Sequence, residues 1–117
     1  MDELIDLVPP NAFLISVESG KTHPLDKELI NIGRRLENQL VIDDARVSRN
    51  HAQLRAVKGR YVLFDLNSTG GTFVNGKRVS QSVVYPGDVL SFGGVLLNFS
   101  QDDPDPPARA DLAATVL

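Results

Sequence analysis

The sequence of 117 residues predicts an all-β fold, an antiparallel sandwich of two sheets, on three observations. Short apolar runs of strand type recur throughout residues 11–100. Turn-forming residues, mostly Gly, Asn, Asp and Pro, separate these runs every several residues. The same range contains no segment with the length and apolar period of an amphipathic helix. Short strands joined by tight turns are typical of β-sandwiches, whose loops at one end carry the binding site.

The apolar runs place the expected strands at residues 12–17, 27–34, 40–42, 51–56, 61–66, 72–74, 77–79, 89–92 and 95–99. Asn75-Gly76 is the clearest turn, because a two-residue type I′ turn needs a positive φ at both positions, which Asn and Gly tolerate. Further turns are expected at residues 19–21, 58–59, 86–88 and 93–94.

Alternation within the strands predicts which side chains share a face. In residues 51–56, Ala52, Leu54 and Ala56 are expected to point inward, and His51, Gln53 and Arg55 outward. In residues 12–17, Phe13, Ile15 and Val17 share one face.

Charge is distributed unevenly along the chain. Residues 21–79 carry 11 of the 12 Lys and Arg and 6 of the 15 Asp and Glu, a net charge of +5, whereas the remainder carries −8. The centre therefore attracts anions and both ends are acidic. The overall charge of −3 argues against a general nucleic-acid binder, which is usually basic throughout.

Composition excludes several other classes of protein. The absence of cysteine excludes disulfides and thiolate metal sites and fits the cytoplasm, and two histidines are too few for a metal cluster. We therefore expect no metal and no cofactor. No apolar run has the length of a membrane span, and the first residues lack the pattern of a signal peptide, so no membrane association is expected.

The two ends are expected to lie outside the globular domain of residues 11–100. Residues 1–10 form an N-terminal arm that ends in Pro9-Pro10, and we favour a frayed terminus over a docked arm. Residues 101–117 are acidic and rich in proline, as in a linker or tail. A short helix from about residue 107 is an alternative for the second half of this tail.

Within residues 11–100, four motifs resemble those of the forkhead-associated (FHA) domain. They are Gly33-Arg34, Ser48-x-x-His51, the segment 65–72 (DLNSTGGT) and Asn75-Gly76. The resemblance implies an eleven-stranded sandwich that binds phosphothreonine in unstructured protein segments. Such a module would be non-catalytic and would serve Ser/Thr-kinase signalling, with a kinase or its substrates as partners. Its oligomeric state is not implied.

The residue chemistry agrees with an anion site of this kind. Phosphothreonine carries a charge of about −1.5 to −2 and three acceptor oxygens. Arg34 offers a planar, permanently charged fork of donors, and Ser48 adds a hydroxyl group. Arg49 adds charge and backbone N–H groups beside Ser48, and the resemblance places Thr69 in the same pocket. It assigns supporting roles to Gly33, His51, Asn75 and Gly76.

Two further positions concern peptide specificity. The resemblance implies that Arg46, two residues before Ser48, reads the residue three positions beyond the phosphothreonine and favours an acidic one. Gly70 stands where many family members have an asparagine that holds the peptide backbone. This departure predicts weaker gripping of the peptide or an altered sequence preference.

Three alternatives accompany this interpretation. Arg34 alone would be read as a surface arginine paired with Glu37 or Asp44. Ser48, His51 and Asp65 invite a hydrolase reading, but no nucleophile elbow is present, and we expect no enzyme activity. His51 is instead expected to hydrogen-bond the Ser48 loop and the neighbouring backbone. The main rival function is a phosphorylation-independent interaction or scaffold domain of the same fold.

Overall fold

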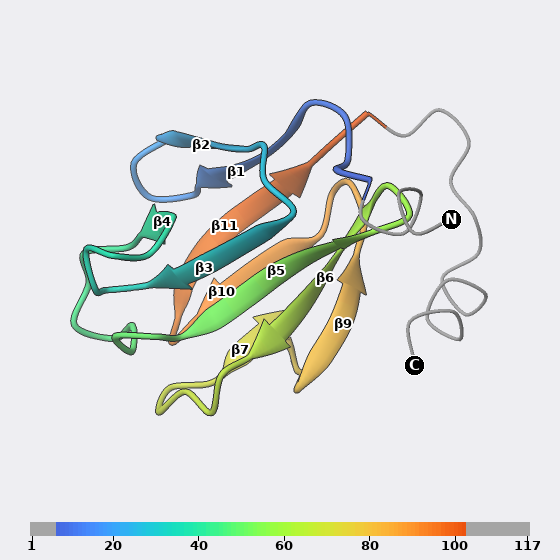
Figure 1. Ribbon diagram of the computed structural model, residues 1–117. Helices are drawn as coiled ribbons and strands as arrows, with labels where there is room; N and C mark the ends of the chain where they lie inside the picture. The colour runs from blue at the N-terminus through green and yellow to red at the C-terminus, as the bar shows by residue number, and fades with distance from the viewer. Residues whose placement is uncertain (1–6, 103–117) are drawn as a thin grey trace.

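The computed structural model describes residues 7–102 (Figure 1). In this range the chain forms eleven strands in two sheets and no helix, so it contains no helix that could cross a membrane. The expected all-β sandwich of two sheets is confirmed. The strands extend from Ala12 to Ser100, within the domain limits expected from the sequence.

The first sheet has six strands. In spatial order these are β2 (Thr22–Leu25), β1 (Ala12–Ser16), β11 (Val95–Ser100), β10 (Val89–Phe92), β7 (Thr72–Val74) and β8 (Lys77–Arg78). The second sheet has five: β4 (Leu40–Val41), β3 (Leu29–Gly33), β5 (Ala52–Val57), β6 (Arg60–Asp65) and β9 (Gln81–Val84). The β3–β4 pair is parallel, with Ile32 opposite Leu40, which corrects the expectation of a wholly antiparallel sandwich. Residues 34–39 connect the two strands, and within them the N–H of Asn38 donates to the carbonyl of Arg35 at 3.1 Å.

The core lies between the facing sides of the two sheets. Leu14 and Leu97 of the first sheet and Ile32 and Leu63 of the second are at most 1% exposed. Burying side chains of this size stabilises the fold by roughly 1.5–3 kcal/mol each. This packing holds the strand ends in fixed positions, and the loops that join them start from a rigid frame.

Two strands were not expected from the sequence. β2 contains Pro24, and both β2 and β9 are half polar. Each lies at the edge of its sheet, where a proline is tolerated and one side of the strand faces solvent. Apolar periodicity is weak in such strands, so the pattern does not reveal them.

The predicted faces are partly confirmed. Ala52, Leu54 and Ala56 are buried as expected, but His51 is fully buried rather than outward-facing. His51 precedes the first residue of β5, so strand alternation does not apply to it. In β1 it is Ala12 and Leu14 that face the core, while Val17 lies beyond the strand and is 51% exposed.

The described part of the N-terminal arm is attached to the sandwich. The N–H of Gly59 donates to the carbonyl of Leu7 at 2.9 Å, and Val8 packs against the core. The N–H of Asp102 donates to the carbonyl of Pro10 at 3.0 Å. Residues 7–10 are therefore not frayed, contrary to expectation. Residues 1–6 and the helix considered after residue 107 lie outside the described residues.

Tyr61 provides a test of the core. Its hydroxyl donates to the carbonyl of Lys27 at 2.6 Å, and burial, followed by the charge of Asp26, raises the pKa of Tyr61 to about 12. Tyr61→Phe should lower the free energy of unfolding at pH 7 by about 0.5–1.5 kcal/mol, because one buried hydrogen bond is lost.

The pH dependence distinguishes this effect from simple repacking. Since the folded pKa lies above the unfolded value of about 10, the contribution of Tyr61 is complete below pH 10 and is lost as the pH rises through the folded pKa of about 12. Urea unfolding should show the difference between the two proteins shrinking across this window. A constant difference up to pH 12 would contradict the assignment.

Candidate anion-binding site

One end of the sandwich carries an open pocket of about 660 Å³. The walls come from the β3–β4 loop (residues 34–39), the β4–β5 loop (42–51), the β6–β7 loop (66–71) and the β10–β11 turn (93–94). These loops lie at the lower left of Figure 1, away from the two ends of the described chain. The lining residues are Arg34, Ala45, Arg46, Val47, Ser48, Arg49, Thr69, Gly70 and Gly93.

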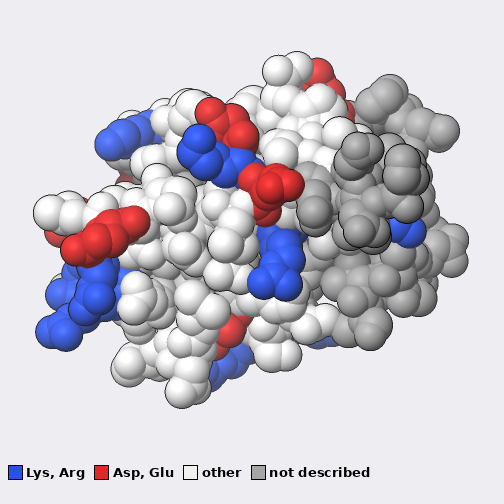
Figure 2. Space-filling view, viewed as in Figure 1, with Lys and Arg blue, Asp and Glu red and all other residues white. Residues whose placement is uncertain are grey.

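The pocket brings together all six residues that the sequence proposed for phosphate and peptide contacts: Arg34, Arg46, Ser48, Arg49, Thr69 and Gly70. Its lining contains three arginines and no carboxylate. In Figure 2 one group of Lys and Arg atoms lies at the lower left, with acidic atoms beside it, and further basic groups are spread over the rest of this face. The electrostatic character of the pocket suits an anion.

Arg34 follows directly after β3 and is held by the β4–β5 loop. Its backbone N–H donates to the carbonyl of Ser48 at 3.0 Å, and its side-chain Nε donates to the carbonyl of Val47 at 3.0 Å. The two Nη groups have no hydrogen-bond partner among residues 7–102. Within the described residues Arg34 has no ion pair; Glu37 pairs with Arg35 instead, at 3.9 Å.

Ser48 is fixed by two loops at once. Its backbone N–H donates to Nδ1 of His51 at 3.0 Å, and its Oγ accepts a hydrogen bond from the N–H of Thr69 at 3.1 Å. Because Oγ acts as an acceptor here, the hydroxyl proton of Ser48 remains available to a ligand.

The imidazole of His51 joins these loops from beneath the pocket. It is fully buried, and its Nε2 lies 2.9 Å from the carbonyl oxygen of Gly71. Since Nδ1 accepts from Ser48, Nε2 carries the proton and donates, which is the neutral tautomer. Both expected hydrogen bonds of His51 are present. The ring contacts the backbone of Ser48 and not its hydroxyl, so the geometry is not that of a nucleophile and its base.

Asp65 organises the β6–β7 loop. Its Oδ1 accepts from Ser68 Oγ at 2.6 Å and from Thr72 Oγ1 at 2.7 Å, and Ser68 Oγ in turn accepts from the N–H of Gly71 at 3.0 Å. Burial acts to raise the pKa of Asp65, but the hydrogen bonds from Ser68 and Thr72 outweigh it and hold this pKa below its ordinary value. Sequence reasoning missed this role. The Asp-x-x-Ser spacing, at which an aspartate accepts from the backbone three residues on, is the available signal.

Two glycines allow close approach of backbones around the pocket. A Cβ on Gly33 would lie 2.1 Å from the carbonyl oxygen of Arg49, so no other residue fits there without displacing the loop. A Cβ on Gly70 would lie 2.9 Å from the Cα of Gly93. The asparagine that many FHA domains have at this position therefore has no room in the present packing.

Asn75 and Gly76 do not line the pocket. They form the expected two-residue turn between β7 and β8, with φ angles of 52° and 81°. Nδ2 of Asn75 donates to Asp88, and its Oδ1 accepts from the N–H of Val89, each at 2.9 Å. These contacts fasten the hairpin to the start of β10.

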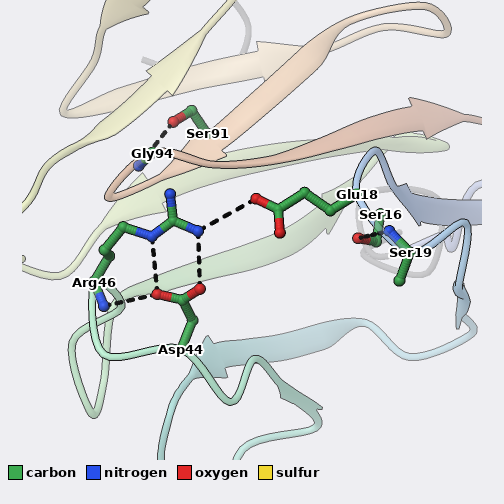
Figure 3. A network of polar contacts seen from close by, with 7 residues as sticks. All are labelled: Ser16, Glu18, Ser19, Asp44, Arg46, Ser91 and Gly94. Carbon is green, nitrogen blue, oxygen red and sulfur yellow. Dashed lines mark hydrogen bonds and ion pairs between the residues drawn. The ribbon is translucent and has the colours of Figure 1, made fainter.

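Arg46 is paired within the chain (Figure 3), which the sequence did not indicate. Its Nε and Nη2 donate to the two carboxylate oxygens of Asp44, both at 2.9 Å, and Nη2 also lies 3.3 Å from Glu18. The hydrogen bonds from Arg46 lower the pKa of Asp44 to about 2. Glu18 is 28 residues away in sequence, so no local pattern could reveal this partner.

Among the described residues, no group of three or more His, Asp or Glu side chains is arranged to hold a metal ion.

Comparison with known proteins identifies similar sequences. The family model for the FHA domain matches residues 30–93. The glycogen accumulation regulator GarA of Mycobacterium tuberculosis is 30% identical over 99 residues, which cover 81% of this chain and 61% of GarA. The oxoglutarate dehydrogenase inhibitor of Corynebacterium efficiens is 32% identical over 98 residues, covering 80% and 69% respectively. The chain thus spans less than two thirds of the length of GarA.

Solved structures are similar as well. One, from a study of phosphothreonine-dependent FHA domain interactions, superposes with a TM-score of 0.74 at 32% identity and covers 79% of this chain and 97% of its own. Another, EmbR of Mycobacterium tuberculosis in complex with a low-affinity phosphopeptide, gives a TM-score of 0.76 at 30% identity, covering 84% and 26%.

Asp65→Asn tests the loop organisation. The substitution removes the charge that accepts three hydrogen bonds, so it should lower the free energy of unfolding at pH 7 by about 1–3 kcal/mol. Because the folded pKa of Asp65 is depressed, this contribution is present above the unfolded value of about 3.9 and is lost as the pH falls through the folded pKa. Urea unfolding at several pH values measures both effects.

Asp43→Asn is the matched control, since Asp43 lies on the β4–β5 loop, is exposed, and undergoes the same change of charge. It should leave stability within about 0.5 kcal/mol of the wild type. Equal stability of the Asp65 and Asp43 variants at pH 7 would contradict the role assigned to Asp65.

Proposed function

Because the chain belongs to the FHA domain family, whose model matches more than half of its residues, we propose that it is a non-catalytic module that binds phosphothreonine in other proteins. The observation that carries this proposal is the convergence of Arg34 and Ser48 on one pocket, each with donor groups left for a ligand. The proposed partners are unstructured segments phosphorylated by a Ser/Thr kinase, or the kinase itself, in the cytoplasm.

The geometry supports recognition of a phosphate dianion. The Nη groups of Arg34 provide paired, charged donors, the hydroxyl of Ser48 adds a third, and Arg49 and Thr69 line the same pocket. A charge-assisted hydrogen bond contributes about 1.5–3 kcal/mol net. Two or three such bonds, after the losses of association, give dissociation constants near micromolar, as suits a reversible contact.

A binding role fits the chemistry better than catalysis does. The ring nitrogens of His51 contact two backbone groups, and the carboxylate of Asp65 accepts from Ser68 and Thr72. Ser48, His51 and Asp65 therefore do not form a catalytic relay. The curated relatives named above are a regulator and an inhibitor rather than catalysts. Of the two solved structures named above, the first comes from a study of phosphothreonine-dependent FHA domain interactions, and the second contains a bound phosphopeptide.

One observation favours the rival, a phosphorylation-independent interaction domain. Gly70 offers no side chain to hold a peptide backbone, and its packing on Gly93 leaves no space for one. Isothermal titration of one peptide as its phosphothreonine, phosphoserine and unphosphorylated forms separates the two functions. Binding of the phosphothreonine form alone, or in clear preference, supports the proposal. Comparable binding of the phosphorylated and unphosphorylated forms would overturn it.

Arg34→Ala should weaken binding of a phosphothreonine peptide by about 2–5 kcal/mol, because the phosphate would lose its charged donors in a site that still excludes part of its hydration. The fold should change little, since the side chain makes one hydrogen bond, to Val47. Arg35→Ala is the matched control: Arg35 is adjacent, pairs with Glu37 and does not line the pocket. Similar losses for both variants, or a large drop in the melting temperature of Arg34→Ala, would contradict a phosphate-binding role.

Affinity should also depend on the charge of the phosphate. We expect binding to weaken as the pH falls through the second pKa of the phosphate, about 6, because the monoanion gains less from Arg34. Titrations between pH 5 and 7.5 measure this directly. A flat profile would exclude recognition of the dianion.

A further inference from the structure

The pocket is charged unevenly between its two sides. On the side of the second sheet, Arg34 and Arg49 line the pocket, and neither pairs with a carboxylate among residues 7–102. On the side of the first sheet, Arg46 stands between two acidic residues (Figure 3). Asp44 comes from the β4–β5 loop and Glu18 from the β1–β2 turn. The network contains one arginine and two carboxylates, which gives it a formal charge of −1.

The donors of Arg46 are largely used within the network. Nε and Nη2 hold both oxygens of Asp44, and Nη2 is shared with Glu18. The backbone N–H of Arg46 also donates to Asp44, at 2.9 Å. The remaining group, Nη1, faces the β10–β11 turn, where a Cβ on Gly94 would lie 3.6 Å from it. Nη1 has no hydrogen-bond partner among residues 7–102, so a ligand carboxylate could reach Arg46 at Nη1, or at Nε and Nη2 by displacing one of the two acids.

The acidic groups, in contrast, keep free acceptor capacity. Glu18 contacts Arg46 through Oε1 only, and its side chain is 68% exposed. Its second oxygen is therefore available to a cation arriving from solvent. An acidic ligand residue in the same place would meet two carboxylates and one arginine that is already paired.

We propose that the network of Glu18, Asp44 and Arg46 selects ligands with a basic side chain in the segment that lies beside Arg46, and disfavours an acidic side chain there. This inference rests on the proposed binding of phosphothreonine peptides. This proposal is the opposite of the preference for an acidic ligand residue that the family resemblance implied for Arg46. The reason is that Asp44 and Glu18, whose pairing with Arg46 the sequence did not reveal, make the charge of the network negative. Glu18 is thereby the specificity-determining residue of this side.

The test uses a set of phosphothreonine peptides with a common core, in which each flanking position in turn is Lys, Ala or Asp. Dissociation constants are measured by fluorescence anisotropy for the wild type, Glu18→Gln and Glu28→Gln. Glu28 is the matched control, because it is exposed, does not line the pocket, and lies at the opposite end of β3 from Arg34. Its removal changes the net charge equally without touching the network.

For the wild type we expect one flanking position at which the Lys peptide binds about two- to five-fold more tightly than the Asp peptide, the range of an exposed ion pair. Glu18→Gln should reduce this ratio to near one, and Glu28→Gln should preserve it. Phosphate-dependent binding with no such position, with an Asp preference, or with a Lys preference unchanged in Glu18→Gln would overturn the inference and leave the proposed function standing. Equal binding of the unphosphorylated core would instead overturn the proposed function.

Discussion

The buried imidazole of His51 is the constraint on which the candidate site depends. One ring nitrogen accepts from the backbone of Ser48 and the other donates to the carbonyl of Gly71, so two loops from different parts of the chain are tied at a fixed separation. The edge of the ring also packs against Phe92 of the core, with ring centroids 5.6 Å apart. Because no water reaches this ring, either loop could move only by leaving a buried polar group unpaired.

The sandwich makes this constraint effective. β3 ends at Gly33, and β5 begins at Ala52, immediately after His51. The chain between them, residues 34–51, is therefore anchored at both ends in the packed second sheet. The carbonyl of Gly71 accepts a second hydrogen bond, from the N–H of Gly93 in the turn between β10 and β11 of the first sheet. The pocket is thus built from backbone that the two sheets hold in place, and its charged side chains are attached to a preformed frame.

Most of the fold could be predicted from the sequence, because strands with clear alternation and Gly- or Asn-containing turns carry local signals. The edge strands β2 and β9 could not, since half-polar strands lack the apolar pattern. The convergence of Arg34, Ser48 and Thr69 on one pocket was implied by the resemblance to the FHA domain and not by any local pattern, since the three residues lie on three different loops. The burial of His51 and the pairing of Arg46 with Glu18 depend on which loops the fold brings together, and neither has a local signature.

The shared carbonyl of Gly71 has a consequence for how such a domain can diversify. Three loops meet there through main-chain atoms and one buried ring, so the shape of the anion socket is insensitive to the identity of exposed side chains around it. Exposed positions around the pocket, such as Ala45 and Glu18, do not contribute to this junction, so substitutions there are expected to alter ligand preference while leaving the pocket backbone in place. His51, Gly71 and Gly93, which meet at this carbonyl, depend on one another, so a change at one of them requires changes at the others.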